Sequence, residues 1–242
     1  SYQPVCFTGR ISRKERMERR FTLPDIAKRI EEQTGLMSTR EDWYPMSLVA
    51  PMSKLSAALW GADVLHLSCH PHCTIGTYVV IGPDGTPVPI TKFIDVEGLF
   101  TEMEKLSNKA GKARIKHYRN IKTFNSLKKY FNEKTAPKGM TFKHFLESLY
   151  GLVDKDWGRG DKRPNYHAML VAGMHFMDAY NYEVERVQRC VVHYSAPDGK
   201  IYPFCSYNSG PTYRERVEKQ FSISAEEWNR RNPHLATCLP KD

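Results

Sequence analysis

The sequence contains no apolar run close to the roughly 20 residues that a membrane-spanning helix requires. It also lacks the layout of a secretory signal, because the opening stretch SYQPVCFTGR does not place a basic segment before an apolar one. Internal repeats are absent, and so is the regular alternation of strands and helices that is typical of a parallel sheet. We therefore expect a cytoplasmic α+β protein whose only membrane contact would be peripheral, at the inner membrane face.

The chain also lacks an initiator methionine. Its first residues, YQPVCFTG, have the pattern of a strand that runs into a turn. We therefore expect the sequence to begin inside a domain and to be part of a longer protein.

Acidic residues are fewer than basic ones, 27 against 36, which leaves a formal charge of +9. This imbalance favours an anionic partner, such as nucleic acid, phospholipid headgroups or a phosphorylated substrate. The most basic stretch, residues 112–131, carries an apolar stripe among its lysines and arginines. It predicts either a solvated helix face or a face that meets phosphate or a membrane surface. With 40% hydrophobic residues, the chain also has enough apolar material to form a core.

Helical periodicity appears in several separate segments. Residues 22–35, TLPDIAKRIEEQTG, predict an amphipathic helix with Thr22 as its N-cap and Gly35 at its C-terminal end. Further helices are expected at residues 52–61, 95–131, 141–153, 183–189, 211–221 and 222–232.

Strand patterns surround a short segment that is rich in cysteine and histidine. Strands are expected before it, at residues 63–70, and after it, at residues 77–93, where a Pro-Asp-Gly turn separates two arms. A second Pro-Asp-Gly turn predicts a hairpin over residues 190–205. Together with the helices, these short strands indicate an α+β fold.

Two local pairs of cysteines are the strongest candidates for a chemical role. Cys69 and Cys73 enclose His-Pro-His, and the proline would stiffen a turn that presents both thiols to one side. Cys190 and Cys205 stand at the two ends of the expected hairpin, and they would face each other if its arms pair symmetrically. The pairs predict a site with four thiolate ligands, which zinc or an iron–sulfur cluster would both accept. Burial of reduced thiols is the competing interpretation.

Other residues near these cysteines are weaker candidates. His70 and His72 could ligate zinc, although flanking histidines more often form hydrogen bonds. The Cys69–Cys73 spacing is one residue too wide for the Cys-x-x-Cys redox motif. A nucleophilic cysteine with His193 or His175 as its base is a further alternative that no local signature supports.

A polar group also lies among methionines and aromatic residues, in the segment GMHFMDAYNYEVERV. Its members are His175, Asp178 and Asn181. They predict either the edge of a ligand pocket or an ordinary core with polar capping before a short helix.

Six segments, taken in order, resemble the C-terminal half of the radical S-adenosylmethionine proteins related to archaeal tetraether lipid synthase. The similarity covers most of the chain, and its most specific parts are the His-Pro-His-Cys segment and the Cys-x14-Cys hairpin. The six segments are QPVCFTGRI, DWYPMSLVAPMSKL, HPHCTIGTYVVI, VPITKFIDVEGL, GMHFMDAYNYEVERVQRC and CVVHYSAPDGKIYPFCSYN.

The resemblance implies that this chain holds an auxiliary [4Fe–4S] cluster. Cys73, Cys190 and Cys205 match the family pattern best, and Cys69 is carried over as the fourth ligand although some members have alanine there. Cys6 stands where the family has serine, so no ligand role is carried onto it.

The resemblance also implies S-adenosylmethionine and a further [4Fe–4S] cluster, which the family binds through a Cys-x3-Cys-x2-Cys motif. This chain lacks the motif, because Gly76 stands where the third cysteine would be. An N-terminal radical S-adenosylmethionine portion of the longer protein would supply both cofactors. This chain should therefore be inactive by itself.

The implied fold has two parts. Residues 1–20 would close a partial (β/α) barrel, and residues 21–242 would form an accessory iron–sulfur domain with short strands, a β-hairpin and several helices. This domain would also bind an isoprenoid ether phospholipid substrate, in which a 5′-deoxyadenosyl radical activates terminal chain carbons that are then joined. The rival hypothesis is a zinc-stabilised module that binds nucleic acid through residues 112–131, although nucleic acid is not the favoured partner.

Overall fold

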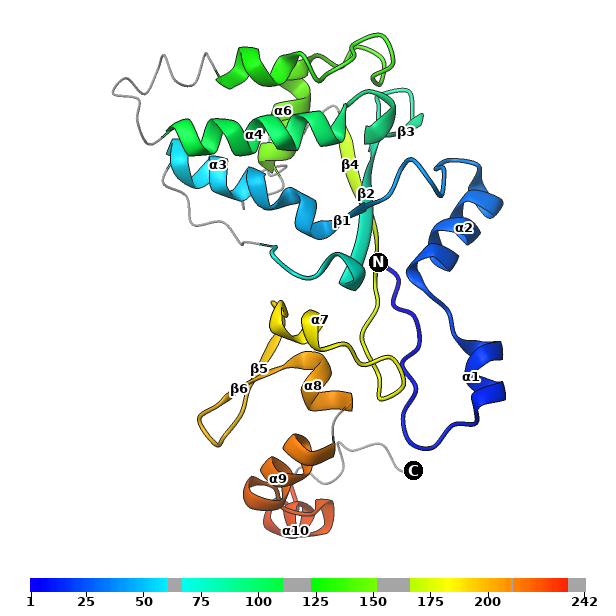
Figure 1. Ribbon diagram of the computed structural model, residues 1–242, viewed down its shortest axis with the longest axis vertical. Helices are drawn as coiled ribbons and strands as arrows, with labels where there is room; N and C mark the ends of the chain where they lie inside the picture. The colour runs from blue at the N-terminus through cyan, green and yellow to red at the C-terminus, as the bar shows by residue number, and fades with distance from the viewer. Residues whose placement is uncertain (61–66, 111–122, 152–165, 210, 235–242) are drawn as a thin grey trace. The chain divides into compact units, whose positions relative to one another are not determined.

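The computed structural model describes residues 1–60, 67–110, 123–151, 166–209 and 211–234 (Figure 1). The chain divides into two compact units. We call the first, formed by Ser1–Cys6 and Ile11–Phe176, the sheet unit, and the second, formed by Phe7–Arg10 and Met177–Asp242, the hairpin unit. The expected boundary at residue 20 does not coincide with this division, and a barrel-closing role for residues 1–20 stays a prediction.

The described elements mix helices with antiparallel strands, as the composition and turn patterns indicate. None of the helices within the described ranges is both long enough and apolar enough to cross a bilayer. Besides the elements discussed below, the sheet unit contains α1 (Arg13–Arg19) and the 3-10 turns η1 (Met46–Val49) and η3 (Ile90–Lys92).

The sheet unit is organised around β2 (Thr74–Ile81), which carries the apolar run TIGTYVVI. β4 (His167–Met174) pairs antiparallel with β2 at all eight residues and so occupies one edge completely. β1 (Tyr44–Pro45) and β3 (Pro87–Pro89) pair with the two ends of β2, and they must therefore share its other edge. The expected arms on either side of the first Pro-Asp-Gly turn are thus β2 and β3.

The predicted helix over residues 22–35 is confirmed as α2 (Leu23–Thr34). The Asp25 carboxylate accepts a hydrogen bond of 2.8 Å from the Thr22 backbone N–H, which satisfies one free donor at the start of the helix. Gly35 ends the helix with φ at 62°, a backbone conformation that glycine adopts without steric cost.

α2 covers β4 at a position where the strand has no side chain. A Cβ added to Gly173 would lie 3.0 Å from Leu23 Cδ2 and 3.1 Å from Ile26 Cδ1. Glycine at this position therefore permits the close approach of helix and sheet.

The main hydrophobic core joins β2 to α3 (Ala50–Trp60), α4 (Val96–Ala110) and α6 (Phe142–Gly151). Val80 from the strand, Leu99 from α4 and Phe145 from α6 are all buried. The Phe93 and Phe145 rings meet edge to face, with centroids 6.0 Å apart. These helices confirm the expected helical segments within the described residues, except that residues 129–131 form a turn and a β-bridge; residues 112–122 of the basic stretch lie outside the described part of the chain.

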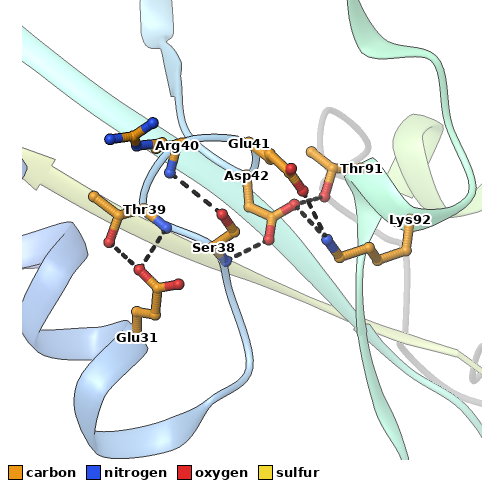
Figure 2. Close-up of polar contacts among 8 residues, drawn as sticks. All are labelled: Glu31, Ser38, Thr39, Arg40, Glu41, Asp42, Thr91 and Lys92. Carbon is orange, nitrogen blue, oxygen red and sulfur yellow. Dashed lines mark hydrogen bonds and ion pairs between the residues drawn. The ribbon is translucent and has the colours of Figure 1, made fainter.

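A buried carboxylate connects the loop after α2 to η3 (Figure 2). Asp42 has no exposed surface, and one of its oxygens accepts a 2.6 Å hydrogen bond from the Ser38 backbone N–H. Its other oxygen accepts a hydrogen bond from the Thr91 hydroxyl and lies 3.4 Å from Lys92 Nζ. Asp42 thereby connects two segments that are 49 residues apart in the sequence.

The hairpin unit contains the second predicted hairpin, formed by β5 (His193–Ser195) and β6 (Ile201–Pro203). Its turn includes Gly199 with φ at 77°. The surrounding helices are α7 (Val184–Gln188), α8 (Phe204–Ser209), α9 (Pro211–Phe221) and α10 (Ala225–Arg231).

Candidate functional site

The Cys69–Cys73 segment forms a tight turn that leads into β2. His70 is the N-cap of η2 (Pro71–Cys73), and its Nδ1 accepts a 3.3 Å hydrogen bond from the His72 backbone N–H. The expected strand over residues 63–70 is wrong at residues 67–70, which are irregular, and residues 61–66 lie outside the described part of the chain. The physical reason is Pro71, which has no N–H for a strand ladder and whose fixed φ favours the start of a 3-10 turn.

The two thiols of this segment have different surroundings. Cys69 is buried, and its Sγ lies 3.8 Å from the Thr74 hydroxyl. Cys73 is partly exposed, and its backbone carbonyl accepts a 2.9 Å hydrogen bond from the His175 N–H, just beyond β4. The His70 and His72 rings pack edge to face with centroids 4.7 Å apart, and a ligand role for either histidine stays a prediction.

The structure adds Cys6 to the same end of the sheet, which the sequence pattern did not indicate. Its thiol donates a 3.2 Å hydrogen bond to the Phe176 carbonyl. Phe176 follows His175, the residue that donates to Cys73. Because Cys6 lies far from Cys69 and Cys73 in the sequence, only strand pairing could bring these residues to one end of the sheet.

Cys190 and Cys205 lie just outside the ladder of the hairpin. The register pairs His193 with Pro203 and is symmetric about Asp198, but Cys190 lies eight residues before Asp198 and Cys205 seven residues after it, so the two cysteines are not cross-strand partners. They nevertheless lie at the same end of the hairpin. Cys190 Sγ donates to the Val192 carbonyl at 3.0 Å, and this carbonyl also accepts the N–H of Phe204, the residue before Cys205.

The hydrogen bonding at Cys205 is of a kind found at the cysteine ligands of iron–sulfur clusters. The Cys205 sulfur accepts a 3.3 Å hydrogen bond from the Met177 backbone N–H, and such N–H···S bonds tune the sulfur ligands of iron–sulfur clusters. The described cysteines form no disulfide. A shared site made by both pairs stays a prediction.

The polar residues after β4 build a loop of the hairpin unit, which supports the interpretation as a capped core. Asp178 is 2% exposed and accepts hydrogen bonds from the backbone N–H groups of Phe7, at 3.0 Å, and Tyr180, at 2.9 Å. The Asn181 side chain in turn accepts the Asp178 N–H at 2.7 Å. These contacts hold Phe7–Arg10 against the loop that leads to the hairpin.

The hairpin turn carries a titratable pair. The Tyr202 hydroxyl donates a 2.5 Å hydrogen bond to Asp198, which lowers the pKa of Asp198 below 3.8 and raises the pKa of Tyr202 above 10.0. The stabilisation from Asp198 is therefore complete above its usual pKa and is lost as the pH falls through the lowered value. The stabilisation from Tyr202 is complete below pH 10.0 and is lost as the pH rises through the raised value.

We expect Tyr202→Phe to return the pKa of Asp198 towards 3.8, because the hydrogen bond from Tyr202 is the main cause of the lowered pKa. Carboxyl carbon NMR across an acid titration measures this change. Tyr194→Phe is the matched control, since the Tyr194 hydroxyl accepts from Asn208 instead. An unchanged Asp198 titration in Tyr202→Phe would contradict the assignment.

The sheet unit also contains an apolar cavity of about 290 Å³. Met46, Met52, Leu99 and Phe145 contribute to its wall, and Tyr78 and Leu170 contribute from the sheet. Burial raises the pKa of the Tyr78 phenol, as an apolar environment requires. The cavity therefore favours an uncharged and largely apolar ligand.

Comparison with known proteins finds a similarity that extends over most of the chain. Over 234 residues, the chain is 39% identical to the 7,8-dihydro-6-hydroxymethylpterin dimethyltransferase of Methanocaldococcus jannaschii. The match covers 95% of this chain and 45% of that enzyme, so the chain spans about half the length of its curated relative. No protein-family model matches the chain. This identity over nearly the whole chain indicates common ancestry with part of a methyltransferase.

Proposed function

We propose that this chain is the C-terminal portion of a radical S-adenosylmethionine enzyme that methylates a reduced pterin. The observation that carries the proposal is its 39% identity, across 95% of its length, to a pterin dimethyltransferase. The placement in the C-terminal half and the radical chemistry follow from the resemblance of the six sequence segments described above. In this proposal, the relative's substrate class replaces the lipid that the resemblance alone implies.

The role proposed for this chain is to hold an auxiliary [4Fe–4S] cluster through Cys69, Cys73, Cys190 and Cys205. When bound, such a cluster transfers electrons or holds a reaction intermediate near the substrate. The chain's own contribution is positional. The turn at Pro71 fixes Cys73 at the start of β2, and the Met177 N–H orients the Cys205 sulfur.

The full-length enzyme tests the proposal. It is incubated anaerobically with S-adenosylmethionine, a reductant and 7,8-dihydro-6-hydroxymethylpterin, and the products are followed by mass spectrometry. We expect 5′-deoxyadenosine and a pterin that has gained one or more methyl groups. Formation of 5′-deoxyadenosine without any methylated pterin would contradict the substrate, and absence of both would contradict the class of enzyme.

A second candidate substrate is an isoprenoid ether phospholipid, and the apolar cavity of about 290 Å³ is the observation that favours it. A hydrocarbon segment would suit a wall made mostly of methionine, leucine and phenylalanine, whereas a pterin would meet hydrogen-bonding side chains only at Tyr44, Ser53, Thr77 and Tyr78. The same assay with diether lipid as substrate separates the two candidates. Coupled lipid chains would support the second candidate, and unaltered lipid would contradict it.

A further inference from the structure

One edge of β4 ends in a short parallel contact with the first residues of the chain. Tyr2 forms a parallel bridge with Gly173. The Tyr2 N–H donates to the Ala172 carbonyl at 2.8 Å, and the Met174 N–H donates to the Tyr2 carbonyl at 2.9 Å. This is the bonding pattern of a parallel ladder, in which one residue bonds to the two neighbours of its partner.

The rest of this edge has no strand partner among the residues that the structure describes. Backbone groups alternate along a strand, so the N–H and C=O groups of Ala168 and Leu170 point the same way as those of Ala172 and Met174. The alternate residues, such as Met169 and Val171, point to β2 instead. The outward groups before Ala172 therefore form an open template for another strand.

The side chains of β4 suit a paired strand better than a free edge. Its sequence is HAMLVAGM, without any lysine, arginine, acidic residue or proline to block pairing. Met169 and Leu170, on opposite faces, remain 47% and 41% exposed. Exposed apolar side chains on an unprotected edge indicate that a further segment covers this strand.

The direction of the bridge identifies that segment. Residues 1–6 run parallel to β4, since Tyr2 meets Gly173 and Cys6 meets Phe176. Traced backwards in the same register, the five positions before Ser1 would face Val171 to His167, one partner for each position. The preceding chain would thus enter along the open edge.

We propose that β4 accepts a parallel strand formed by the five residues that precede Ser1 in the full-length protein. This inference rests on the proposed function, in which the chain is the C-terminal portion of a longer enzyme. The strand would make β4 an internal strand of the sheet. It would also attach the sheet unit to the upstream portion through backbone hydrogen bonds as well as through the covalent link.

Hydrogen exchange of single amides, measured by NMR, tests this proposal in the 242-residue chain and in the full-length enzyme. The amides of Ala168, Leu170 and Ala172 are expected to exchange at least about tenfold more slowly in the full-length enzyme. The amides of Met169 and Val171, which face β2, serve as internal controls and should change little. Equal rates for the first group in both proteins would overturn the proposal.

A full-length variant with proline at the first, third and fifth residues before Ser1, whose N–H groups would donate to β4, identifies the covering segment. The proposal expects fast exchange at Ala168 and Leu170 to return, while the β2-facing amides stay protected and report that the sheet remains folded. Continued protection would mean that another segment or a second copy covers the edge, and would overturn the proposal. An enzyme that methylates pterin without this protection refutes only the strand. Protection in a protein without S-adenosylmethionine chemistry refutes only the proposed function.

Discussion

Replacing Cys190 with alanine is expected to remove the auxiliary iron–sulfur cluster from the anaerobically purified 242-residue chain. The wild-type chain should show a broad brown absorbance near roughly 400 nm and about four irons, and the variant should lose both. The reason is that a methyl group cannot bind iron, so the hairpin would offer only Cys205 and could no longer hold its side of the cluster as a pair of thiolates. Because the chain lacks the Cys-x3-Cys-x2-Cys motif, this measurement reports the auxiliary cluster alone.

Cys6→Ala is the matched control for this experiment. Cys6 is also a partly exposed, reduced cysteine, but its thiol donates to the Phe176 carbonyl at the end of β4. We expect the iron content and absorbance to be unchanged in this variant. Iron retained in Cys190→Ala would contradict the assignment of the hairpin thiols, and a colourless wild-type chain with one zinc would contradict the cluster itself.

The second large effect is expected at Asp42, whose replacement by alanine should lower the free energy of unfolding by about 3 kcal/mol. The carboxylate has no exposed surface, and it binds the Ser38 N–H, the Thr91 hydroxyl and Lys92. Its removal leaves the partly buried Ser38 and Thr91 donors without this acceptor and releases the loop after α2 from η3. The value lies at the lower end for buried ion pairs, because the Lys92 side chain is 45% exposed and its charge stays hydrated.

Urea unfolding followed by circular dichroism measures this loss, and Glu41→Ala provides the comparison. Glu41 is the adjacent residue and also lies 3.6 Å from Lys92, yet its side chain is 73% exposed. An exposed ion pair contributes little, so this variant should change the free energy of unfolding by less than about 1 kcal/mol. Equal effects of the two substitutions would show that burial of Asp42 does not stabilise the loop.

Local signals were sufficient for several elements of the fold. The amphipathic pattern between Thr22 and Gly35 predicts α2 because its apolar spacing, its capping residues and its terminal glycine all act within one segment. Each Pro-Asp-Gly turn likewise predicts a pair of antiparallel arms, and both pairs are present as β2–β3 and β5–β6. At Pro71 the local prediction failed. Residues 67–70 do not form the expected strand, and a 3-10 turn begins at Pro71.

The register of the hairpin shows where local reasoning ended. The sequence identifies Cys190 and Cys205 as the ends of a hairpin, but a shift of one residue decides which side chains face each other. The observed ladder is centred on Asp198, from which Cys190 is one residue further than Cys205. The spacing of the two cysteines does not show on which residue the turn is centred.

By itself, the sequence determined the helices and turns of this protein and the two local cysteine pairs, because each depends on residues within about 16 positions of one another. Only the tertiary structure decided that Asp42 is buried beside Thr91 and Lys92 and that Cys6 reaches the end of β4 beside Phe176. It also showed that β4 pairs with β2 along one whole edge. On the other edge, among the described residues, β4 has a bridge to Tyr2 only. The physical reason is that burial and strand pairing join segments separated by 170 residues and more, for which the local pattern of side chains carries no distance information.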